Sequence, residues 1–425
     1  MSGVAGLAGA RVLVIGLARS GRAAAETLRA QGAAVIGYDR DESVDVGRLR
    51  ELGVEVHLGR EEEALHMLSQ GGIDLIVKSP GVPGETPLVL DARTRAIPVW
   101  SEIELGTRLL PNPLIGVTGT NGKTTTSELL GAIFRAAGWP VEVAGNVGRP
   151  LTSLTGTVQP DTWIVCELSS FQLEDVETLR PRIAVLLNLE PDHLDRHGTF
   201  EWYADTKLRI FELQTEDDTA VVPRGFGAIP GGARRLEFAF DDPLPAEPAI
   251  PGAHNRENAA AATVAARAAG VPDDAIASAL QSFPGVPHRI EEVATIDGVR
   301  YVNDSKATNV AAALRAIAAL RDSTLHVILG GLGKNESYAP LARGFRAGDH
   351  TYLIGTAAPE IARALDDANA AYTFCGELSV AVRKAAAAAS PGEIVLLSPA
   401  CASFDQFDDF ETRGDEFRRL VEELS

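Results

Sequence analysis

The sequence is short of positive charge. It holds 39 Lys and Arg residues against 58 Asp and Glu residues, which gives a formal net charge of -19 at pH 7. No run of Lys or Arg interrupts this acidic composition. A surface of this kind repels polyanions, so we expect neither a nucleic acid nor an anionic membrane as a partner.

Cysteine is scarce as well. The three cysteines, Cys166, Cys375 and Cys401, are odd in number and far apart in the chain. Their spacing excludes a disulfide framework and a site built from paired thiolate ligands. They are typical of buried thiols in a reducing compartment.

Long apolar runs are also missing. No stretch approaches the roughly 18 apolar residues of a membrane span. No basic segment precedes the first apolar stretch, as it does in a secretory signal peptide. We therefore expect a cytoplasmic protein with no membrane partner. We also expect it to act as a monomer.

What the chain does contain is a regular alternation of strand-like and helical patterns. Its 425 residues exceed one ordinary core, and the length favours roughly two to four domains. Near-continuous apolar runs between helical patterns indicate parallel sheets covered on both faces. The segments Leu110–Pro113 and Pro284–Pro287 are typical linkers, because their prolines exclude helix. We predict an α/β fold with three domains: a Rossmann-like domain at 1–109, a central P-loop ATPase-type parallel sheet at 110–285, and a Rossmann-like α/β domain at 286–425.

The first predicted domain begins with a strand-helix-strand unit. A strand over Ala10–Gly16 leads through the loop Gly16–Gly21 into a helical pattern, and a second strand over Ala33–Tyr38 ends at Asp39–Arg40. This is the layout of nucleotide-binding folds. The loop lacks the middle glycine that brings backbone closest to a pyrophosphate, so dinucleotide binding is only weakly indicated. A later strand over 73–78 runs into a Ser-Pro-Gly turn at a carboxyl end, where α/β sheets bind ligands.

The most informative segment is Gly116–Thr126, which follows an apolar run and opens a helical pattern. In such a loop, glycines let backbone N–H groups converge on phosphate oxygens, a lysine reaches the terminal phosphates, and a threonine hydroxyl can bind Mg²⁺. Lys123 and Thr124 stand at those positions. The common pattern requires a glycine six residues before the lysine, where this chain has Val117. The segment thus predicts a nucleotide loop of a less common type; a Gly-rich turn with an incidental Lys-Thr pair is the alternative.

Acidic groups follow later apolar runs, where parallel strands place their carboxyl ends at one edge of a sheet. Glu167 closes the strand-like run Asp161–Leu168. Mg²⁺ takes one or two carboxylates together with phosphates and waters, so Glu167 is a candidate ligand. A solvated glutamate at a strand end is the alternative. His193 stands between Asp192 and Asp195 after the next strand-like run, which favours a metal or catalytic role over a structural one.

The loop Gly119–Thr124 resembles that of the Mur ligase superfamily, which includes the folylpolyglutamate synthases, and the resemblance runs nearly end to end. The matching segments are Gly16–Gly21, Ser79–Gly81, Gly119–Thr124, Gly145–Gly148, Glu167–Gln172, Asp192–Asp195, Lys207–Ile210, Gly252–Asn258, His288–Arg289, Asn303–Asn309 and Leu397–Gln406. The last two resemble the members that add D-glutamate. The Asp-Tyr-Ala-His segment of the ligases that add a diamino acid or a dipeptide is absent.

The resemblance implies an ATP-dependent amide ligase that joins D-glutamate to UDP-N-acetylmuramoyl-L-alanine in peptidoglycan precursor synthesis. It implies ATP binding by Gly119, Thr120, Asn121, Gly122, Lys123, Thr124, Thr125, Asn258, Arg289 and Asp304. Two Mg²⁺ ions would be held by Thr124, Glu167, His193 and Lys207, the last as a carbamate. Catalytic roles fall to Lys123, Glu167, His193 and Lys207. The residue pattern by itself would make Lys207 a solvated surface charge on a helix.

The other two substrates have implied sites too. The UDP-sugar would be bound by Leu17, Ala18, Arg19, Ser20, Asp39, Arg40, Ser79 and Asn146. D-glutamate would be bound by Thr308, Lys334, Ser403 and Phe410, a cationic and hydroxyl-rich set suited to two carboxylates. Leu332 stands where relatives often carry a polar residue, so the residue that faces D-glutamate near Lys334 stays open.

Three other functions remain alternatives. The L-alanine-adding ligase and folylpolyglutamate synthase share parts of the same motifs. The strand-helix-strand unit is also compatible with a nucleotide-binding oxidoreductase or regulatory module, although the missing middle glycine speaks against it. A ligase homologue that only binds its ligands is the third possibility.

Overall fold

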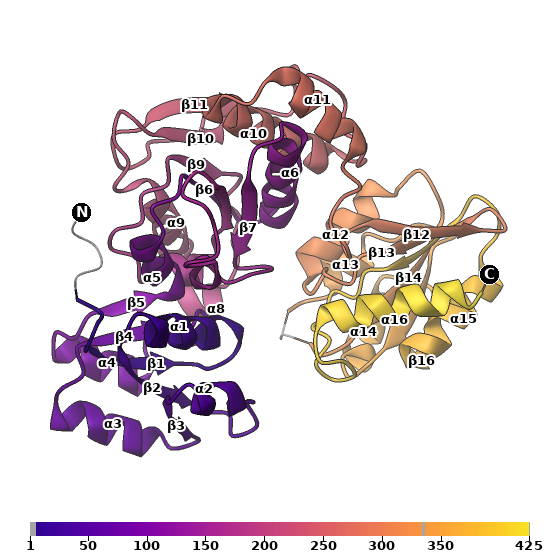
Figure 1. The fold of residues 1–425 in the computed structure, drawn as a ribbon. Coiled ribbons are helices and arrows are strands. Elements are labelled where there is room, and N and C mark those ends of the chain that lie inside the picture. Colours follow the sequence, from indigo (N-terminus) through magenta and orange to yellow (C-terminus); the bar gives the residue numbers. More distant parts are fainter. Residues whose placement is uncertain (1–5, 334–335, 425) are drawn as a thin grey trace. The chain divides into compact units, whose positions relative to one another are not determined.

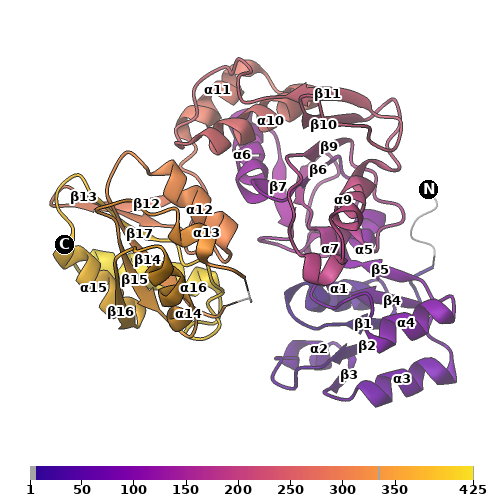
Figure 2. The same cartoon turned by 180° about the vertical axis from the view of Figure 1, so that it is seen from behind.

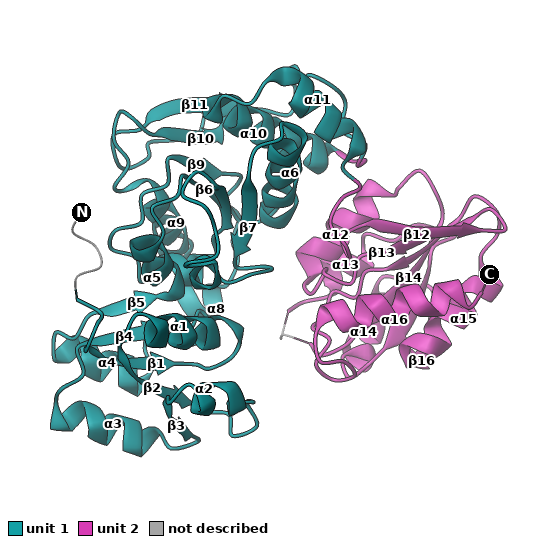
Figure 3. Cartoon of the chain, in the orientation of Figure 1, with its two compact units in different colours: residues 1–249, 253–283 teal, residues 250–252, 284–425 magenta. Residues whose placement is uncertain are grey.

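The computed structural model describes residues 6–333 and 336–424 (Figure 1). These residues form two compact units, one of residues 1–249 with 253–283 and one of residues 250–252 with 284–425 (Figure 3). The first unit contains two β-sheets and the second contains one. The predicted α/β fold class is confirmed, whereas the predicted domain boundaries stay predictions.

The first sheet of unit 1 is fully parallel, with strand order β3-β2-β1-β4-β5. Its strands are β1 (Arg11–Ile15), β2 (Ala34–Asp39), β3 (Glu55–Leu58), β4 (Leu75–Lys78) and β5 (Val99–Ser101). Its helices are α1 (Arg19–Ala30), α2 (Gly47–Glu51), α3 (Glu61–Gln70), α4 (Pro87–Thr94) and α5 (Glu102–Leu109). One face packs against α1, α2 and α5, the other against α3 and α4. Both faces are therefore apolar.

The second sheet of unit 1 is also parallel, with strand order β11-β10-β9-β6-β8-β7. Its strands are β6 (Leu114–Thr118), β7 (Val141–Gly145), β8 (Trp163–Glu167), β9 (Ile183–Leu186), β10 (Thr219–Pro223) and β11 (Arg234–Phe238). Its helices are α6 (Lys123–Ala136), α7 (Ser170–Leu173), α8 (Leu194–His197), α9 (Phe200–Leu208), α10 (Ala253–Ala269) and α11 (Asp273–Ser282), with 3-10 turns η1 (Leu151–Leu154) and η2 (Arg209–Phe211). Helices α6, α10 and α11 pack on one another (Figure 2).

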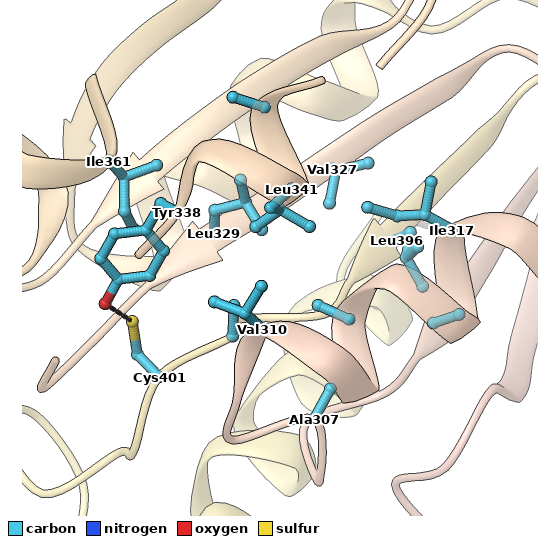
Figure 4. Packing of buried hydrophobic residues seen from close by; sticks show 14 of the residues in the cluster. Ala307, Val310, Ile317, Val327, Leu329, Tyr338, Leu341, Ile361, Leu396 and Cys401 are labelled. Atoms are coloured by element: carbon cyan, nitrogen blue, oxygen red, sulfur yellow. Dashed lines mark hydrogen bonds between the residues drawn. The ribbon is translucent and has the colours of Figure 1, made fainter. Parts of the chain in front are cut away.

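Unit 2 holds a six-stranded sheet of order β12-β13-β17-β14-β15-β16. Its strands are β12 (Glu291–Ile296), β13 (Val299–Asn303), β14 (Leu325–Gly330), β15 (His350–Ile354), β16 (Tyr372–Gly376) and β17 (Ile394–Leu397). Its helices are α12 (Val310–Ala319), α13 (Ala339–Ala342), α14 (Ala358–Asp367), α15 (Leu378–Ala388) and α16 (Phe410–Glu422). Side chains such as Val310, Leu329 and Leu396 fill the core under α12, α13 and α14, where Tyr338 Oη lies 3.1 Å from Cys401 Sγ (Figure 4).

One strand of unit 2 departs from the predicted pattern. β12 is antiparallel to β13, and the two are joined by a tight hairpin at Asp297 and Gly298. These residues have φ values of 48° and 80°, the positive pair that a type I′ turn requires. The Asp-Gly dipeptide is a known signal for such a hairpin, and it accounts for the strand that the predicted pattern lacks.

A buried carboxyl group on α5 makes the stability of unit 1 depend on pH. Glu102 Oε1 accepts hydrogen bonds from Thr152 N at 2.6 Å and from Thr152 Oγ1 at 2.7 Å. Burial raises the pKa of Glu102 from 4.5 to about 7. Because the folded state holds this proton more tightly than the unfolded state does, the stabilisation is complete below about pH 4.5 and is lost as pH rises through about 7.

We therefore expect Glu102→Gln, which mimics the protonated acid, to match the native protein near pH 4.5 and to exceed its free energy of unfolding by about 3 kcal/mol at pH 8. Urea unfolding of both proteins at several pH values measures this difference. If the difference in free energy of unfolding between the two proteins does not change between pH 4.5 and pH 8, Glu102 does not cause the pH dependence.

Candidate functional site

The phosphate loop joins β6 to α6 and is covered by a side chain of α10. Gly122 has φ 83°, and a Cβ at this position would lie 2.2 Å from Asn258 Oδ1, so a side chain there would clash. The loop is fixed by Asn188: Thr120 N donates to its carbonyl oxygen at 3.0 Å, and Asn121 N donates to its Oδ1 at 2.8 Å. The loop and Asn258, predicted separately to bind ATP, thus contact each other.

Two lysines meet on one carbonyl of this loop. Lys123 Nζ and Lys207 Nζ each donate to Gly119 O at 2.9 Å. The side chain of Lys207 is buried, and its Nζ lies 4.8 Å from the centre of the Tyr203 ring. Burial, and after it the nearby charge of Lys123, hold the pKa of Lys207 well below its ordinary value. The solvated-lysine interpretation is therefore wrong, and Lys207 carries an amine that loses its proton readily.

Glu167 ends β8 beside the segment that follows β7. Asn146 Nδ2 donates to Glu167 Oε1 at 3.0 Å. The Glu167 side chain is buried, and none of the described residues supplies a hydrogen bond to its other oxygen, Oε2. The solvated-glutamate alternative is therefore wrong. A buried carboxylate oxygen without a donor is unfavourable, and a bound cation would satisfy it.

His193 heads α8 in a strained backbone conformation. Its φ of 52° and ψ of 33° lie in the left-handed region that residues with a Cβ rarely adopt. The N–H groups of Arg196 and His197 both donate to His193 O at 3.0 Å, which holds the turn. The imidazole is half exposed, packs edge-on against Phe171 with ring centres 4.8 Å apart, and has Nε2 3.6 Å from Asp192 Oδ2. Strain of this kind clusters at functional sites.

The oxygen ligands near the phosphate loop suit a magnesium ion that binds together with a nucleotide. Within the described part of the chain, no three His, Cys, Asp or Glu side chains converge as a preformed metal cage. Mg²⁺ does not need one, because it keeps waters and binds through one or two carboxylates together with substrate phosphates. The free oxygen of buried Glu167 supplies such a carboxylate.

A cavity of about 350 Å³ lies at the carboxyl edge of the first sheet. This volume lies within the range of small-molecule sites. Seven of the eight residues predicted to bind the UDP-sugar line it: Ala18, Arg19, Ser20, Asp39, Arg40, Ser79 and Asn146. Asn146 also donates to Glu167, so one side of the cavity adjoins the candidate metal ligand.

Leu17 is the predicted residue that does not line the cavity. Its side chain is fully buried in the core, and its N–H donates to Asp39 Oδ2 at 2.6 Å. The other Asp39 oxygen accepts from Asp41 N at 3.0 Å. Glu61 and Thr86, which are not among the predicted residues, also line the cavity. Neither stands in a recognisable motif, so no signal pointed to them.

In unit 2, predicted residues gather where the neighbouring strands β13 and β17 end. The carboxyl group of Asp304 accepts from Ser398 Oγ at 2.8 Å and from Ile290 N at 3.2 Å. Burial raises the pKa of Asp304 to about 7, although the Ser398 hydrogen bond and the Arg289 charge oppose the shift. A neutral and a charged form of Asp304 are therefore both accessible near physiological pH.

The predicted D-glutamate residues lie along the same edge. Thr308 follows β13, Ser403 follows β17, and Phe410 begins α16. Phe410 O accepts from Ser305 Oγ at 2.8 Å, which joins the start of α16 to the loop after β13. Lys334 lies outside the described residues.

Comparison with known proteins shows the family to which this chain belongs. The model of the Mur ligase middle domain matches residues 117–226, and the model described as "Mur ligase, glutamate ligase domain" matches residues 288–401. The chain belongs to the Mur ligase family. The matches cover the phosphate loop, Glu167, His193 and Lys207 in unit 1 and the β13 to β17 region in unit 2.

Two relatives that match nearly the whole length of this Mur ligase carry the same name. The UDP-N-acetylmuramoylalanine–D-glutamate ligase of Acidobacterium capsulatum is 43% identical over 98% of this chain and 96% of its own length. The ligase of the same name from Anaeromyxobacter dehalogenans is 44% identical over 98% of both chains.

Solved Mur ligases share the fold at low identity. The UDP-N-acetylmuramate–alanine ligase of Thermotoga maritima matches with a TM-score of 0.61 and 17% identity over 98% of this chain and 100% of its own. The MurF ligase of the same organism, solved with ADP, has the same TM-score and identity over 86% and 92%. No helix among the described residues of this Mur ligase is long and apolar enough to cross a membrane.

Proposed function

We propose that this Mur ligase uses ATP to join D-glutamate to UDP-N-acetylmuramoyl-L-alanine, as a cytoplasmic monomer. Two observations together carry the proposal: Lys123 and Lys207 converge on Gly119 O, and Asn146, which lines the cavity at the first sheet, donates to the buried Glu167. They support phosphoryl transfer next to a separate acceptor site. The choice of D-glutamate rests on the names of the relatives at 43% and 44% identity.

We assign the phosphate loop to ATP. The N–H groups of residues 119–125 would surround its phosphates, and the N-terminus of α6 adds partial positive charge there. Lys123 would neutralise the transferred phosphoryl group. In the same proposal Asn258 contacts the adenine, Arg289 a phosphate and Asp304 the ribose.

Magnesium is assigned to the edge of the second sheet. When bound, Mg²⁺ neutralises phosphate charge and polarises the phosphoryl group. Thr124 and Glu167 would hold one ion, and His193 with the carbamate of Lys207 a second. The buried amine of Lys207 suits carbamate formation, because only a neutral amine attacks CO₂: the N–C bond forms, one N–H proton leaves, and a carboxylate-like anion results.

We assign the cavity at the first sheet to the UDP-sugar. Arg19 and Ser20 at the start of α1 suit the diphosphate, because a helix N-terminus and a guanidinium both bind anions. Asp39 and Arg40 are assigned to uridine. Ser79 and Asn146 would follow the sugar and its alanyl group toward Glu167.

The chemistry then takes two steps. A carboxylate oxygen of the alanyl group attacks the γ-phosphorus of ATP; the bond to the bridging oxygen breaks, ADP leaves and an acyl phosphate forms. The neutral amine of D-glutamate attacks the acyl carbon, the nitrogen loses a proton, and the C–O bond breaks to release phosphate. Thr308, Ser403, Phe410 and Lys334 would hold D-glutamate in this step.

Substrate choice tests the proposal. We expect phosphate release from ATP to require both UDP-N-acetylmuramoyl-L-alanine and D-glutamate, with at least about 100-fold lower rates for L-glutamate or L-alanine. Turnover with L-alanine and the unsubstituted UDP-sugar, together with none from D-glutamate, would assign the chain to the alanine-adding reaction instead.

A further inference from the structure

One arginine of unit 1 holds the loop that forms a wall of the UDP-sugar cavity. Arg196 Nη1 donates to Pro80 O at 2.8 Å, and its Nη2 donates to Val82 O at 3.1 Å. Pro80 and Val82 both line the cavity. One planar guanidinium from the edge of the other sheet therefore binds two carbonyl groups of that wall. Val82 O also accepts from Lys78 Nζ at 3.0 Å, whereas Pro80 O depends on Arg196.

The same arginine supports the turn that carries His193. Its guanidinium carbon lies 3.9 Å from the centre of the Phe171 ring, and the His193 ring packs against Phe171 with centres 4.8 Å apart. Arg196 N also donates to His193 O at 3.0 Å. Side chain and backbone of Arg196 thus both hold His193, whose left-handed backbone would relax without such support.

The surrounding charges allow Arg196 to be replaced without leaving a carboxylate unpaired. Arg196 Nη2 lies 2.9 Å from Glu174 Oε2, but Lys78 Nζ lies 3.4 Å from the same oxygen. The neighbouring Asp175 is paired with Lys78 at 3.1 Å and with Arg93 at 2.8 Å. Each of the two acids therefore keeps a cation when Arg196 is removed.

We propose that Arg196 is a positioning residue of the ligase: one side chain sets both the Pro80–Val82 wall of the acceptor cavity and the orientation of His193. This inference rests on the proposed function, which assigns the cavity to the UDP-sugar and His193 to a metal ion. Neither the motif pattern nor the relatives' names assign such a role to Arg196. Its partners lie more than a hundred residues away in sequence, at Pro80 and Val82.

Lysine cannot replace this arginine. A guanidinium presents several N–H donors in one plane and lies flat on an aromatic ring, whereas an ammonium is a compact point charge. In Arg196→Lys the ion pair with Glu174 can persist. One ammonium group cannot also donate to both carbonyl groups and stack on the Phe171 ring. Arg196→Lys thus separates the charge of residue 196 from its geometry.

Two binding measurements, one for the cavity and one for the region of His193, test the proposal without measuring turnover. UDP binding reports on the cavity, and Mn²⁺ binding in the presence of a non-hydrolysable ATP analogue reports on the His193 side. We expect Arg196→Met to weaken UDP binding roughly tenfold. We expect it to weaken Mn²⁺ binding also by roughly tenfold, the usual effect of losing an outer-shell support. Arg196→Lys should show the same two losses.

Arg93→Met is the matched control, because Arg93 belongs to the same ion cluster but donates to Gly84 O at 3.3 Å and to Asp175 Oδ1 at 2.8 Å rather than to Pro80 O or Val82 O. It should bind both probes like the native protein. Native affinity for either probe in Arg196→Met, or equal losses in Arg93→Met, would overturn the proposal. Should Arg196→Met not fold, as judged by thermal unfolding, Arg196→Lys decides by the same criteria. A native protein that does not bind UDP at all would instead overturn the proposed function, and the inference with it.

Discussion

Lys123→Ala is expected to lower ATP-dependent ligation by about 10³-fold or more and to leave the unfolding temperature unchanged. Lys123 Nζ lies over the loop, where it donates to Gly119 O and Thr120 O, each at 2.9 Å. In the proposed reaction its charge offsets the charge of the transferred phosphoryl group in a site built from backbone donors. Alanine suits the first turn of α6, so the helix should remain.

The control for Lys123 lies on the same helix. Arg135 is exposed in the last turn of α6, and Arg135→Ala removes the same unit of charge from the protein. Steady-state phosphate release and thermal unfolding of both variants measure the difference. Native turnover in Lys123→Ala would disprove the ATP assignment, and a comparable loss in Arg135→Ala would show that net charge, not position, matters.

Lys207→Met is expected to lower ligation to a similar degree, again about 10³-fold. The side chain is buried and its amine shares the Gly119 carbonyl with Lys123, so a protonated Lys207 would place two cationic groups at one site. A carbamate on Lys207 is an anion, so it attracts the Lys123 ammonium group instead of repelling it. It also adds an anionic ligand near Glu167. Methionine fills the same volume without an amine and should keep the fold.

Chemical rescue separates a carbamate from a structural lysine. In Lys207→Ala the shortened side chain leaves room for a small anion, and we expect acetate or formate to restore part of the activity. Protein prepared with ¹³CO₂ should give a carbamate signal by ¹³C NMR that Lys207→Met lacks. A fully active Lys207→Ala enzyme, or rescue by chloride as effective as rescue by acetate, would rule the carbamate out.

Some parts of this site could be predicted because local chemistry dictates them. The glycines and Lys123 predict the loop after β6, although Val117 replaces the first glycine of the common pattern. The structure gives the reason: Val117 is a fully buried residue of β6, paired with both β8 and β9, and the loop begins only at Gly119. The glycine of the common pattern is unnecessary where the strand continues.

The burial of Lys207 follows from a helical pattern that is present in the sequence. Phe200, Tyr203 and Lys207 stand at positions i, i+3 and i+7, which share one face of a helix. The two aromatic residues mark that face as the inner one. Lys207 thus belongs to the buried side of α9, although a lysine between Thr206 and Leu208 looks like a surface residue when composition alone is considered.

Other features depend on contacts that no local pattern contains. Gly122 must be glycine because Asn258, far along the chain, occupies the space where a Cβ would lie. The contacts of Arg196 with Pro80 and Val82 join loops from two different sheets. Such pairs follow from the packing of unit 1 as a whole, so the sequence predicted the residues that bear recognisable chemistry but not those that position them.

The fate of the acceptor's oxygens tests the account most directly. When the alanyl carboxylate of the UDP-sugar carries ¹⁸O on both oxygens, attack of one oxygen on the γ-phosphorus and later cleavage of the C–O bond must move that oxygen to phosphate. We predict one ¹⁸O atom in each phosphate released with D-glutamate and one retained in the new amide. Phosphate free of the label, formed together with the amide product, would contradict carboxylate activation at the phosphate loop.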